Sequence, residues 1–178
     1  MKYNQNDVSL AIKQDRKAFE NIYIDINNDL YKMALYMLGN SELAKEVVSD
    51  TVMDALVGIC KLKSPERFEK WVLKILTNKC KRKIKDKYNK FNVYNPNAIG
   101  VEAGENVSKG ENIDHETKTD VQIALSKLNT KDRMIVSLCV VEGYKSSEVA
   151  EILSMNSSTV RSRLNRSLKK MREYLEVE

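Results

Sequence analysis

The chain has 178 residues with a hydrophobic content of 42%, which suits one globular domain or two small ones. Only six glycines and two prolines occur, and no run of alternating β-branched residues is present, so an all-α fold is expected. The net charge of +5 is a modest excess, so the distribution of charge is more informative than its sum. No apolar run is long enough to cross a membrane, and residues 1–10 lack a signal core, which predicts a cytoplasmic protein.

The residue types that most often carry catalysis or bind metals are scarce and scattered. Cys60, Cys80 and Cys139 lie far apart and are odd in number, which indicates neither a zinc site nor a disulfide framework. The single histidine, His115, has no nucleophile or metal ligand near it, and no GxxxxGK loop is present. We therefore expect no catalytic site, no metal and no cofactor.

Residues 1–59 carry apolar side chains at helical spacing, with a single expected break. The pattern runs over 10–26 and 30–38, and it resumes at about 42–59. Gly39 suits a helix C-cap and Ser41 the N-cap that follows. Acids outnumber bases nine to six in this part of the chain. The expected core face of the helix at 42–59 consists of Leu43, Val47, Val48, Thr51, Val52, Ala55 and Leu56.

The charge balance reverses between Lys61 and Lys90, where there are twelve basic residues and three acids. Lys61–Pro65 is expected to be a loop, and 68–88 is expected to be one helix. Bases so close together repel one another, and a phosphate backbone would relieve that repulsion, so the segment predicts contact with nucleic acid. A solvated face is the alternative. Trp71 fits either stacking on an unpaired base or a place in the core.

Residues 91–117 hold three of the six glycines and few periodic apolar residues, which predicts a flexible linker. From Val101 to Asp120 there are six acids and two bases, so this segment would avoid phosphates. The predicted domains are therefore 1–90 and 118–178, joined by that linker.

Helical periodicity resumes at Asp120, first over 121–128 and then over Arg133–Val141, where Gly143 suits the closing C-cap. Ser146–Met171 then predicts two short amphipathic helices joined by a turn at 154–156. The expected N-caps are Ser146 or Ser147 for the first helix and Ser157 or Ser158 for the second.

The last helix separates an apolar stripe from a basic face. Six bases and no acid occur from Arg161 to Arg172. This is the sequence form of a helix-turn-helix, whose second helix enters the major groove of DNA. A plain solvated helical hairpin is the alternative. The expected stripe consists of Val160, Leu164, Leu168 and Met171.

These stretches, in this order, resemble a bacterial RNA polymerase sigma factor of the small two-domain extracytoplasmic-function (ECF) type. In the first domain the resemblance rests on AFENIYIDINNDLYKMALYMLGN (18–40), AKEVVSDTVMDAL (44–56) and FEKWVLKILTNKCKRKIK (68–85). In the second it rests on 124–175, where EVA is followed by STVRSRLNR. The resemblance implies two helical domains that bind core polymerase, recognise the −10 and −35 promoter elements and help to melt the duplex.

The resemblance also implies roles for individual residues. The helix at 42–57 would dock on the clamp helices of the polymerase through Leu43, Glu46, Val47 and Asp50. The loop at 61–67 and the helix after it would hold the −10 element through Lys61, Lys63, Arg67, Trp71, Lys74, Asn78, Lys79, Arg82 and Lys83. The −35 element would meet Ser158, Thr159, Arg161, Ser162, Arg163, Asn165 and Arg166.

The chain departs from the family pattern at Lys45, Ser49, Ser154 and Ser158. The family usually has glycine at the two later positions, so slight backbone strain is expected in the turn at Ser154. The implied partners are core RNA polymerase, promoter DNA and an anti-sigma factor bound to the membrane. The alternative is a helix-turn-helix regulator that binds duplex DNA without docking on polymerase, for which residues 1–90 would be dispensable. An enzyme has little support.

Overall fold

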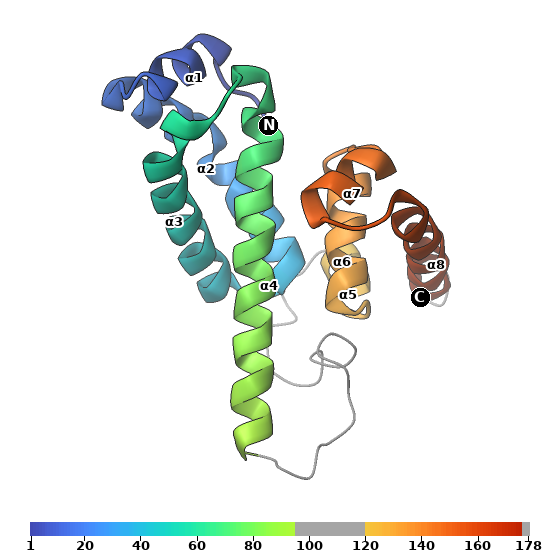
Figure 1. The fold of residues 1–178 in the computed structure, drawn as a ribbon. Helices are drawn as coiled ribbons and strands as arrows, with labels where there is room; N and C mark the ends of the chain where they lie inside the picture. Colours follow the sequence, from blue (N-terminus) through green and yellow to red (C-terminus); the bar gives the residue numbers. More distant parts are fainter. Residues whose placement is uncertain (95–119, 176–178) are drawn as a thin grey trace.

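The computed structural model describes residues 1–94 and 120–175, and every regular element in those two ranges is a helix or a helical turn (Figure 1). No strand occurs within them, which confirms the all-α prediction. None of the described helices is long and apolar enough to cross a membrane. Most of the predicted linker 91–117, including His115, lies outside the described residues.

The chain begins with α1 (Gln5–Ile12) and α2 (Arg16–Leu38), which pack against each other. The expectation of one helical run over 10–26 is wrong, because the chain leaves the helix at 13–15, where Gln14 has a φ of +70°. Asp15 starts the next helix, since its side chain accepts a 3.1 Å hydrogen bond from the N–H of Ala18. Apolar residues before and after the break belong to the same core. The apolar periodicity therefore does not indicate that the helix is interrupted there.

A tight turn joins α2 to α3 (Ser41–Gly58). Gly39 has a φ of +65°, and its N–H donates a 2.7 Å hydrogen bond to the carbonyl of Leu35, which confirms the predicted C-cap. The N-cap is Asn40 rather than Ser41, because the Asn40 side chain accepts a 2.8 Å hydrogen bond from the N–H of Leu43. An asparagine one residue earlier therefore takes the role predicted for the serine.

After two 3₁₀ turns, at Ile59–Lys61 and Pro65–Arg67, the chain enters α4 (Phe68–Tyr94). A helix of 27 residues is about 40 Å long, and α4 stands along the middle of the molecule (Figure 1). It continues six residues beyond the predicted end at Tyr88 and through the first four residues of the predicted linker.

The second part of the chain consists of α5 (Asp120–Ser126), α6 (Thr130–Val136), α7 (Ser146–Leu153) and α8 (Ser157–Leu175). A π-helical turn over Ser137–Val141 follows α6 directly. Two helices therefore precede the helix-turn-helix, as predicted. The helix predicted from Arg133 begins earlier, at Thr130, because the Asn129 side chain accepts a 2.9 Å hydrogen bond from the N–H of Asp132.

The apolar stripe of α8 differs from the predicted one at a single position. Leu168 is 39% exposed, whereas Ser167 is buried beside the core. Spacings of four, three and four residues from Val160 lead to Leu164, Ser167 and Met171, and this alternation follows the 3.6-residue turn better than two successive steps of four. The prediction of Leu168 as a core residue is therefore wrong.

One apolar cluster continues through both parts of the described chain. Val72 and Leu73 of α4 belong to the same cluster as Val149 and Leu153 of α7. In addition, α2 packs against α6. The two predicted domains thus share a continuous core in this arrangement.

Candidate DNA and polymerase interfaces

The turn of the helix-turn-helix contains a serine in the left-handed backbone conformation. Ser154 has a φ of +55° and a ψ of 51°, which confirms the expected strain at the position where the family usually has glycine. The N–H of Met155 donates a 2.9 Å hydrogen bond back to the carbonyl of Ala150, as in a Schellman motif. For a residue with a Cβ, this conformation costs roughly 1–2 kcal/mol, and the surrounding packing must offset that cost.

The N-terminus of α8 is capped from the turn. The Oδ1 atom of Asn156 accepts hydrogen bonds from the N–H of Ser158 at 2.9 Å and from its hydroxyl at 2.8 Å. The N-cap of α7 is Lys145 rather than Ser146 or Ser147, and the Glu148 carboxylate accepts a 3.0 Å hydrogen bond from its N–H. These caps fix where α7 and α8 begin.

All but one of the predicted −35 residues are exposed, and the remaining one forms an ion pair with another helix. Arg163 is the exception, because its Nη1 atom lies 2.8 Å from Asp132 Oδ1 at the start of α6. The others keep their side chains open to a partner. These exposed residues are Ser158, Thr159, Arg161, Ser162, Asn165 and Arg166.

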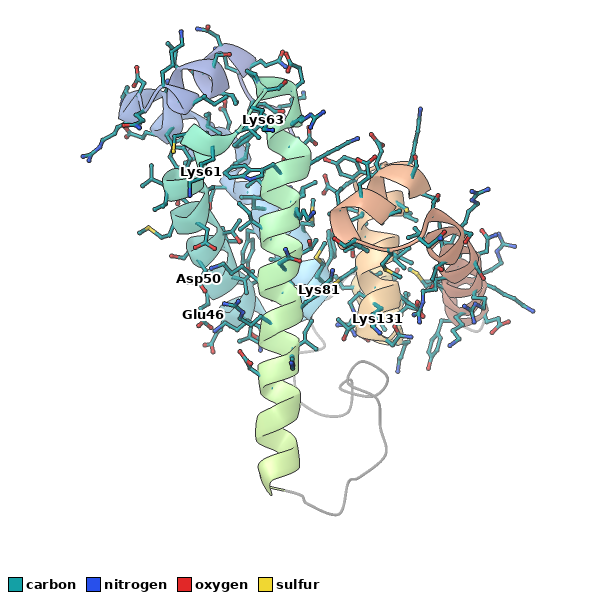
Figure 2. The ribbon with its side chains drawn as sticks, in the orientation of Figure 1. Glu46, Asp50, Lys61, Lys63, Lys81 and Lys131 are labelled. Carbon is teal, nitrogen blue, oxygen red and sulfur yellow. The ribbon has the colours of Figure 1, made fainter. Side chains whose placement is uncertain are left out.

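The predicted −10 residues include an exposed stripe along α4. Lys74, Asn78 and Arg82 are exposed, and their spacing of four residues places them on one face of the helix. Lys61 and Lys63 are also exposed and lie near the N-terminal end of α4 (Figure 2). Together with the exposed Arg67, these residues present a basic surface suited to phosphates.

Trp71 lies at the border between this surface and the core. It is half-buried, and its ring centroid is 6.1 Å from that of Phe68. A Cβ on Gly58, at the end of α3, would come within 3.1 Å of its Cζ2 atom. The glycine therefore provides the space in which the indole packs, so Trp71 is at least partly a structural residue.

Two of the predicted −10 lysines are held by α3. The ammonium group of Lys79 lies 2.7 Å from Asp54 Oδ2, and Lys83 forms an ion pair with Glu46. Both lysines are only partly exposed. These pairs connect the basic helix directly to the acidic one, so Glu46, which was predicted to bind polymerase, also contacts a predicted DNA-binding residue.

The predicted polymerase-binding residues do not all reach the surface of α3. Glu46 and Asp50 are exposed on this helix (Figure 2), and Leu43 is half-buried. Val47 is fully buried, so the prediction that it contacts polymerase directly fails in this conformation. Val47 belongs to the face of α3 that packs on the core, and this packing holds the exposed face in place.

The surface of α3 also carries apolar residues that the sequence analysis missed. Met53 is 59% exposed and Val57 is 72% exposed, and Leu56, which was predicted to widen the core face, is 43% exposed. All three follow Asp50 on the same helix. The exposure of Leu56 was not evident from the sequence, because apolar residues that broaden a helical stripe normally indicate burial.

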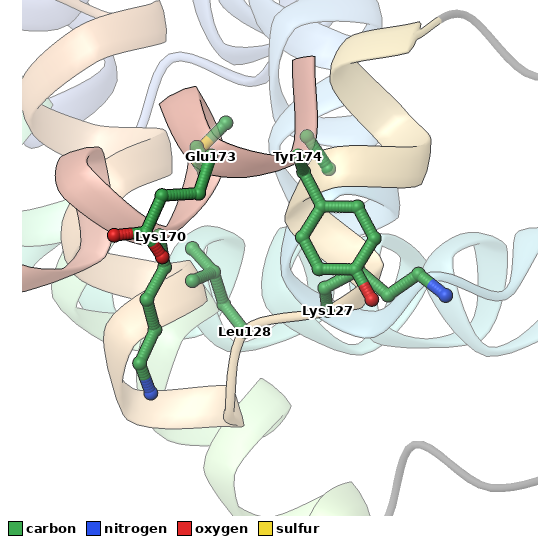
Figure 3. A pocket seen from close by; sticks show the side chains of 7 residues that line it. Lys127, Leu128, Lys170, Glu173 and Tyr174 are labelled. Carbon is green, nitrogen blue, oxygen red and sulfur yellow. The ribbon is translucent and has the colours of Figure 1, made fainter. Parts of the chain in front are cut away.

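A hollow of about 490 Å³ lies between α5 and the C-terminal end of α8 (Figure 3). Ala124, Leu128 and Met171 contribute its apolar lining, and the ammonium group of Lys127 lies 5.1 Å from the centre of the Tyr174 ring. None of the predicted site residues lines it. No motif in the sequence indicated this hollow, because its walls come from two helices about 45 residues apart along the chain.

Two helices with exposed basic residues and one with exposed acids lie on an all-α scaffold, an arrangement suited to a transcription factor. Comparison with known protein families agrees with this class. Residues 23–89 match Sigma-70 region 2, and residues 119–171 match Sigma-70 region 4. The chain is 32% identical over 151 residues to the RNA polymerase sigma factor SigV of Bacillus subtilis, covering 85% of this chain and 87% of the relative.

The chain belongs to the sigma-70 family of RNA polymerase sigma factors and to its ECF type. It is also 26% identical over 172 residues to the ECF RNA polymerase sigma factor SigW of Bacillus subtilis, covering 92% of this chain and 91% of the relative. The chain is therefore a polymerase-associated factor for promoter-specific initiation, in a class of proteins that is not enzymatic. The match to region 2 removes the alternative of a regulator that acts without polymerase.

Solved structures show the same fold. The structure of CnrH in complex with the cytosolic domain of CnrY has a TM-score of 0.68 at 19% identity, covering 98% of this chain and 97% of CnrH. The sigma factor RpoE in complex with the anti-sigma factor NepR, from Bartonella quintana, has a TM-score of 0.71 at 20% identity. That comparison covers 91% of this chain and 99% of RpoE.

Proposed function

We propose that α3 docks this sigma factor on core RNA polymerase, while α4 and α8 bind the −10 and −35 promoter elements. The observation that carries this assignment is the exposed stripe of Lys74, Asn78 and Arg82 on α4. Its basic residues have no acid of α3 against them, in contrast to Lys79 and Lys83 on the neighbouring face.

Docking on polymerase would use the acids of α3 together with its exposed apolar residues. The carboxylates of Glu46 and Asp50 can pair with basic residues of a partner. Met53 and Val57 expose apolar surface, and burying that surface against a partner would be favourable. Interfaces commonly combine an apolar centre with a charged rim. The two acids and the two apolar residues therefore form the proposed docking surface.

Recognition of the −10 element would occur on partly melted DNA. Extruding a base from the duplex costs a few kcal/mol, and a protein pocket must offset that cost with stacking and hydrogen bonds. The exposed loop at 61–67 and the amide of Asn78 offer such contacts, while Lys74 and Arg82 offer contacts to phosphates. The factor would thus act through binding energy and without catalysis of its own.

Transcription from fragmented genomic DNA of the source bacterium tests this function. Transcripts with defined start sites are expected only when both core polymerase and this protein are present. Glu46→Lys and Asp50→Lys should weaken the binding of core polymerase, whereas Glu20→Lys, an identical charge change in an exposed pair with Lys17, should leave it unchanged. Failure of the unaltered protein to bind core polymerase would overturn the proposal.

We also infer an anti-sigma factor as a partner, acting in the cytoplasm, where polymerase and DNA are found. The support is that RpoE was solved with the anti-sigma factor NepR, and CnrH with the cytosolic domain of CnrY. A membrane-bound inhibitor would retain the protein in the membrane fraction of unstressed cells. Recovery of the protein from the soluble fraction alone would rule out the membrane-bound form of this partner.

A further inference from the structure

The loop that precedes α4 is anchored by two apolar side chains. Ile59 and Leu62 are buried, whereas Lys61 and Lys63 beside them are exposed. The N–H of Leu62 donates a 2.9 Å hydrogen bond to the carbonyl of Ile59, which closes the first 3₁₀ turn. A single turn of this kind holds few hydrogen bonds of its own. The direction of the two lysines therefore depends on what Ile59 and Leu62 pack against.

The helix α1 packs against this loop. It contacts both of the 3₁₀ turns that bound the loop, at 59–61 and at 65–67. On α1, Val8 and Ala11 are buried, and they belong to the same apolar cluster as the two anchors of the loop. Figure 1 shows α1 at the end of the molecule where α3 ends and α4 begins. The first helix of the chain thus supports the loop at both of its ends.

A row of aromatic rings extends this support to the start of α4. The ring of Tyr3, which precedes α1, packs edge to face on Phe68, with 5.2 Å between the ring centroids. Phe68 is fully buried, and its ring centroid is 6.1 Å from that of Trp71. Edge-to-face aromatic pairs add stability beyond the area that they bury. Tyr3 therefore holds the residue at which the loop ends and, through it, the indole at the border of the basic surface.

The helix α1 itself has no cationic side chain for DNA. Its eight residues, QNDVSLAI, include one acid and no base. A helix this short is marginal in water by itself, so its packing on α2 and on the loop holds it in place. It also precedes the part of the chain that matches Sigma-70 region 2, which begins at residue 23. A role of α1 in promoter recognition would therefore be indirect and would act through the loop.

We propose that Tyr3 and Val8 are positioning residues for the −10 element, which hold the loop 61–67 in the shape that receives an extruded base. This inference rests on the proposed function, because it supposes that the loop binds the −10 element. A loop that is already ordered loses little conformational freedom on binding, whereas a loosened loop must be ordered by its ligand. Weakening the contacts of α1 should therefore weaken −10 binding, although no residue that meets DNA is changed.

Hydrogen exchange followed by mass spectrometry tests the support in the protein itself. Tyr3→Ala and Val8→Ala should each speed exchange in peptides covering 59–67 by at least about fivefold, because the backbone there opens more often. Peptides covering α8 should exchange at the unaltered rate. Tyr3→Phe, which keeps the ring, should behave as the unaltered protein. Tyr23→Ala removes the same side chain from a more exposed position on α2 and is the matched control.

Binding of DNA by the holoenzyme tests the consequence for the −10 element. The probe is a labelled single-stranded oligonucleotide that carries the −10 element of a promoter mapped by transcription from genomic DNA. Tyr3→Ala and Val8→Ala should raise its Kd by about fivefold to thirtyfold, whereas Tyr3→Phe and Tyr23→Ala should change it by less than about twofold. A duplex probe that carries only the −35 element should bind all of these holoenzymes alike.

The outcomes separate this positioning role from the proposed function. Unchanged exchange at 59–67 in both alanine variants would overturn the positioning role, and so would unchanged binding of the single-stranded probe. An equal rise in exchange throughout the chain would also overturn it, because Tyr3 and Val8 would then serve only the stability of the whole protein. If the holoenzyme of the unaltered protein does not bind the −10 probe, the proposed function fails, and this inference fails with it.

Discussion

Arg163 of the recognition helix lies 2.8 Å from Asp132 at the start of α6, so one of the predicted DNA-binding arginines joins two helices of its own domain. Asp132 is itself oriented by Asn129, whose amide donates a 2.7 Å hydrogen bond to Oδ2. The guanidinium group of Arg163 is therefore part of the packing of α8 on α6, whereas Arg166 is exposed and able to meet bases.

Arg163→Ala is expected to lower the free energy of unfolding by about 1–2 kcal/mol, because it removes a partly buried ion pair. Arg166→Ala should leave stability nearly unchanged and weaken recognition of the −35 element by about 1–3 kcal/mol if the arginine makes a bidentate base contact. Urea unfolding and holoenzyme binding to templates with altered −35 bases measure the two effects. An unchanged promoter preference in Arg166→Ala would remove this residue from the reading surface.

Arg133 is a buried arginine that the sequence analysis treated as the beginning of an apolar helix. Its guanidinium group donates hydrogen bonds to the carbonyls of Leu125 at 3.0 Å, Ser126 at 3.3 Å and Leu128 at 3.1 Å. Arg133→Met should lower the free energy of unfolding by about 2–4 kcal/mol, because these carbonyls lose their partner. Urea unfolding checks this value. Lys131→Met on the same helix is exposed and should cost less than about 0.5 kcal/mol.

Gly58 provides the space for the single tryptophan of the chain, Trp71. Gly58→Ala places a Cβ about 3.1 Å from the indole, closer than ordinary van der Waals contact, so the ring must shift. The expected results are a changed wavelength of tryptophan emission and a loss of about 1–2 kcal/mol in the free energy of unfolding. In a Trp71→Phe background, Gly58→Ala should cost less. Equal costs in the two backgrounds would show that the indole is not the group displaced.

Cys80 is fully buried in α4, and burial raises the pKa of its thiol to about 12. The unfolded chain releases this proton near its ordinary value of about 9, so the folded state loses stability as pH rises from about 9 toward 12. Alkylation with iodoacetamide at pH 8 should therefore modify the exposed Cys60 first and Cys80 only after unfolding. Rapid labelling of Cys80 in the native protein would contradict its burial.

Sequence patterns predicted most helices because each helix has its own periodicity and its own caps. Gly39 was predicted as a C-cap and has a positive φ, and the strain at Ser154 was expected because the family pattern usually has glycine at that position. The break at 13–15 was not predicted: Gln14 also has a positive φ, and nothing in its residue type indicated the end of α1. The N-cap of α3 was predicted at Ser41 instead of Asn40, because asparagine and serine cap helices about equally well and the two residues are adjacent.

The site residues show the limit of carrying a family pattern over to single positions. Lys74, Asn78 and Arg82 are exposed on one face of α4, and their role as DNA contacts stays a prediction. Val47 and Arg163 lie in matching stretches, yet one is buried and the other is paired within its own domain. A matching stretch defines which helix takes part, whereas the direction of each side chain depends on the neighbours against which that helix packs.

The sequence by itself determined the all-α class, the order of the helices, the helix-turn-helix and the separation of an acidic helix from two basic ones, because these follow from local periodicity and from charge along the chain. Only the tertiary structure decided that Lys79 and Lys83 face the acids of α3, and that Lys81 reaches the carbonyl of Leu153. Such contacts join residues up to 72 positions apart. Their partners are chosen by how the helices pack, and no local pattern contains that information.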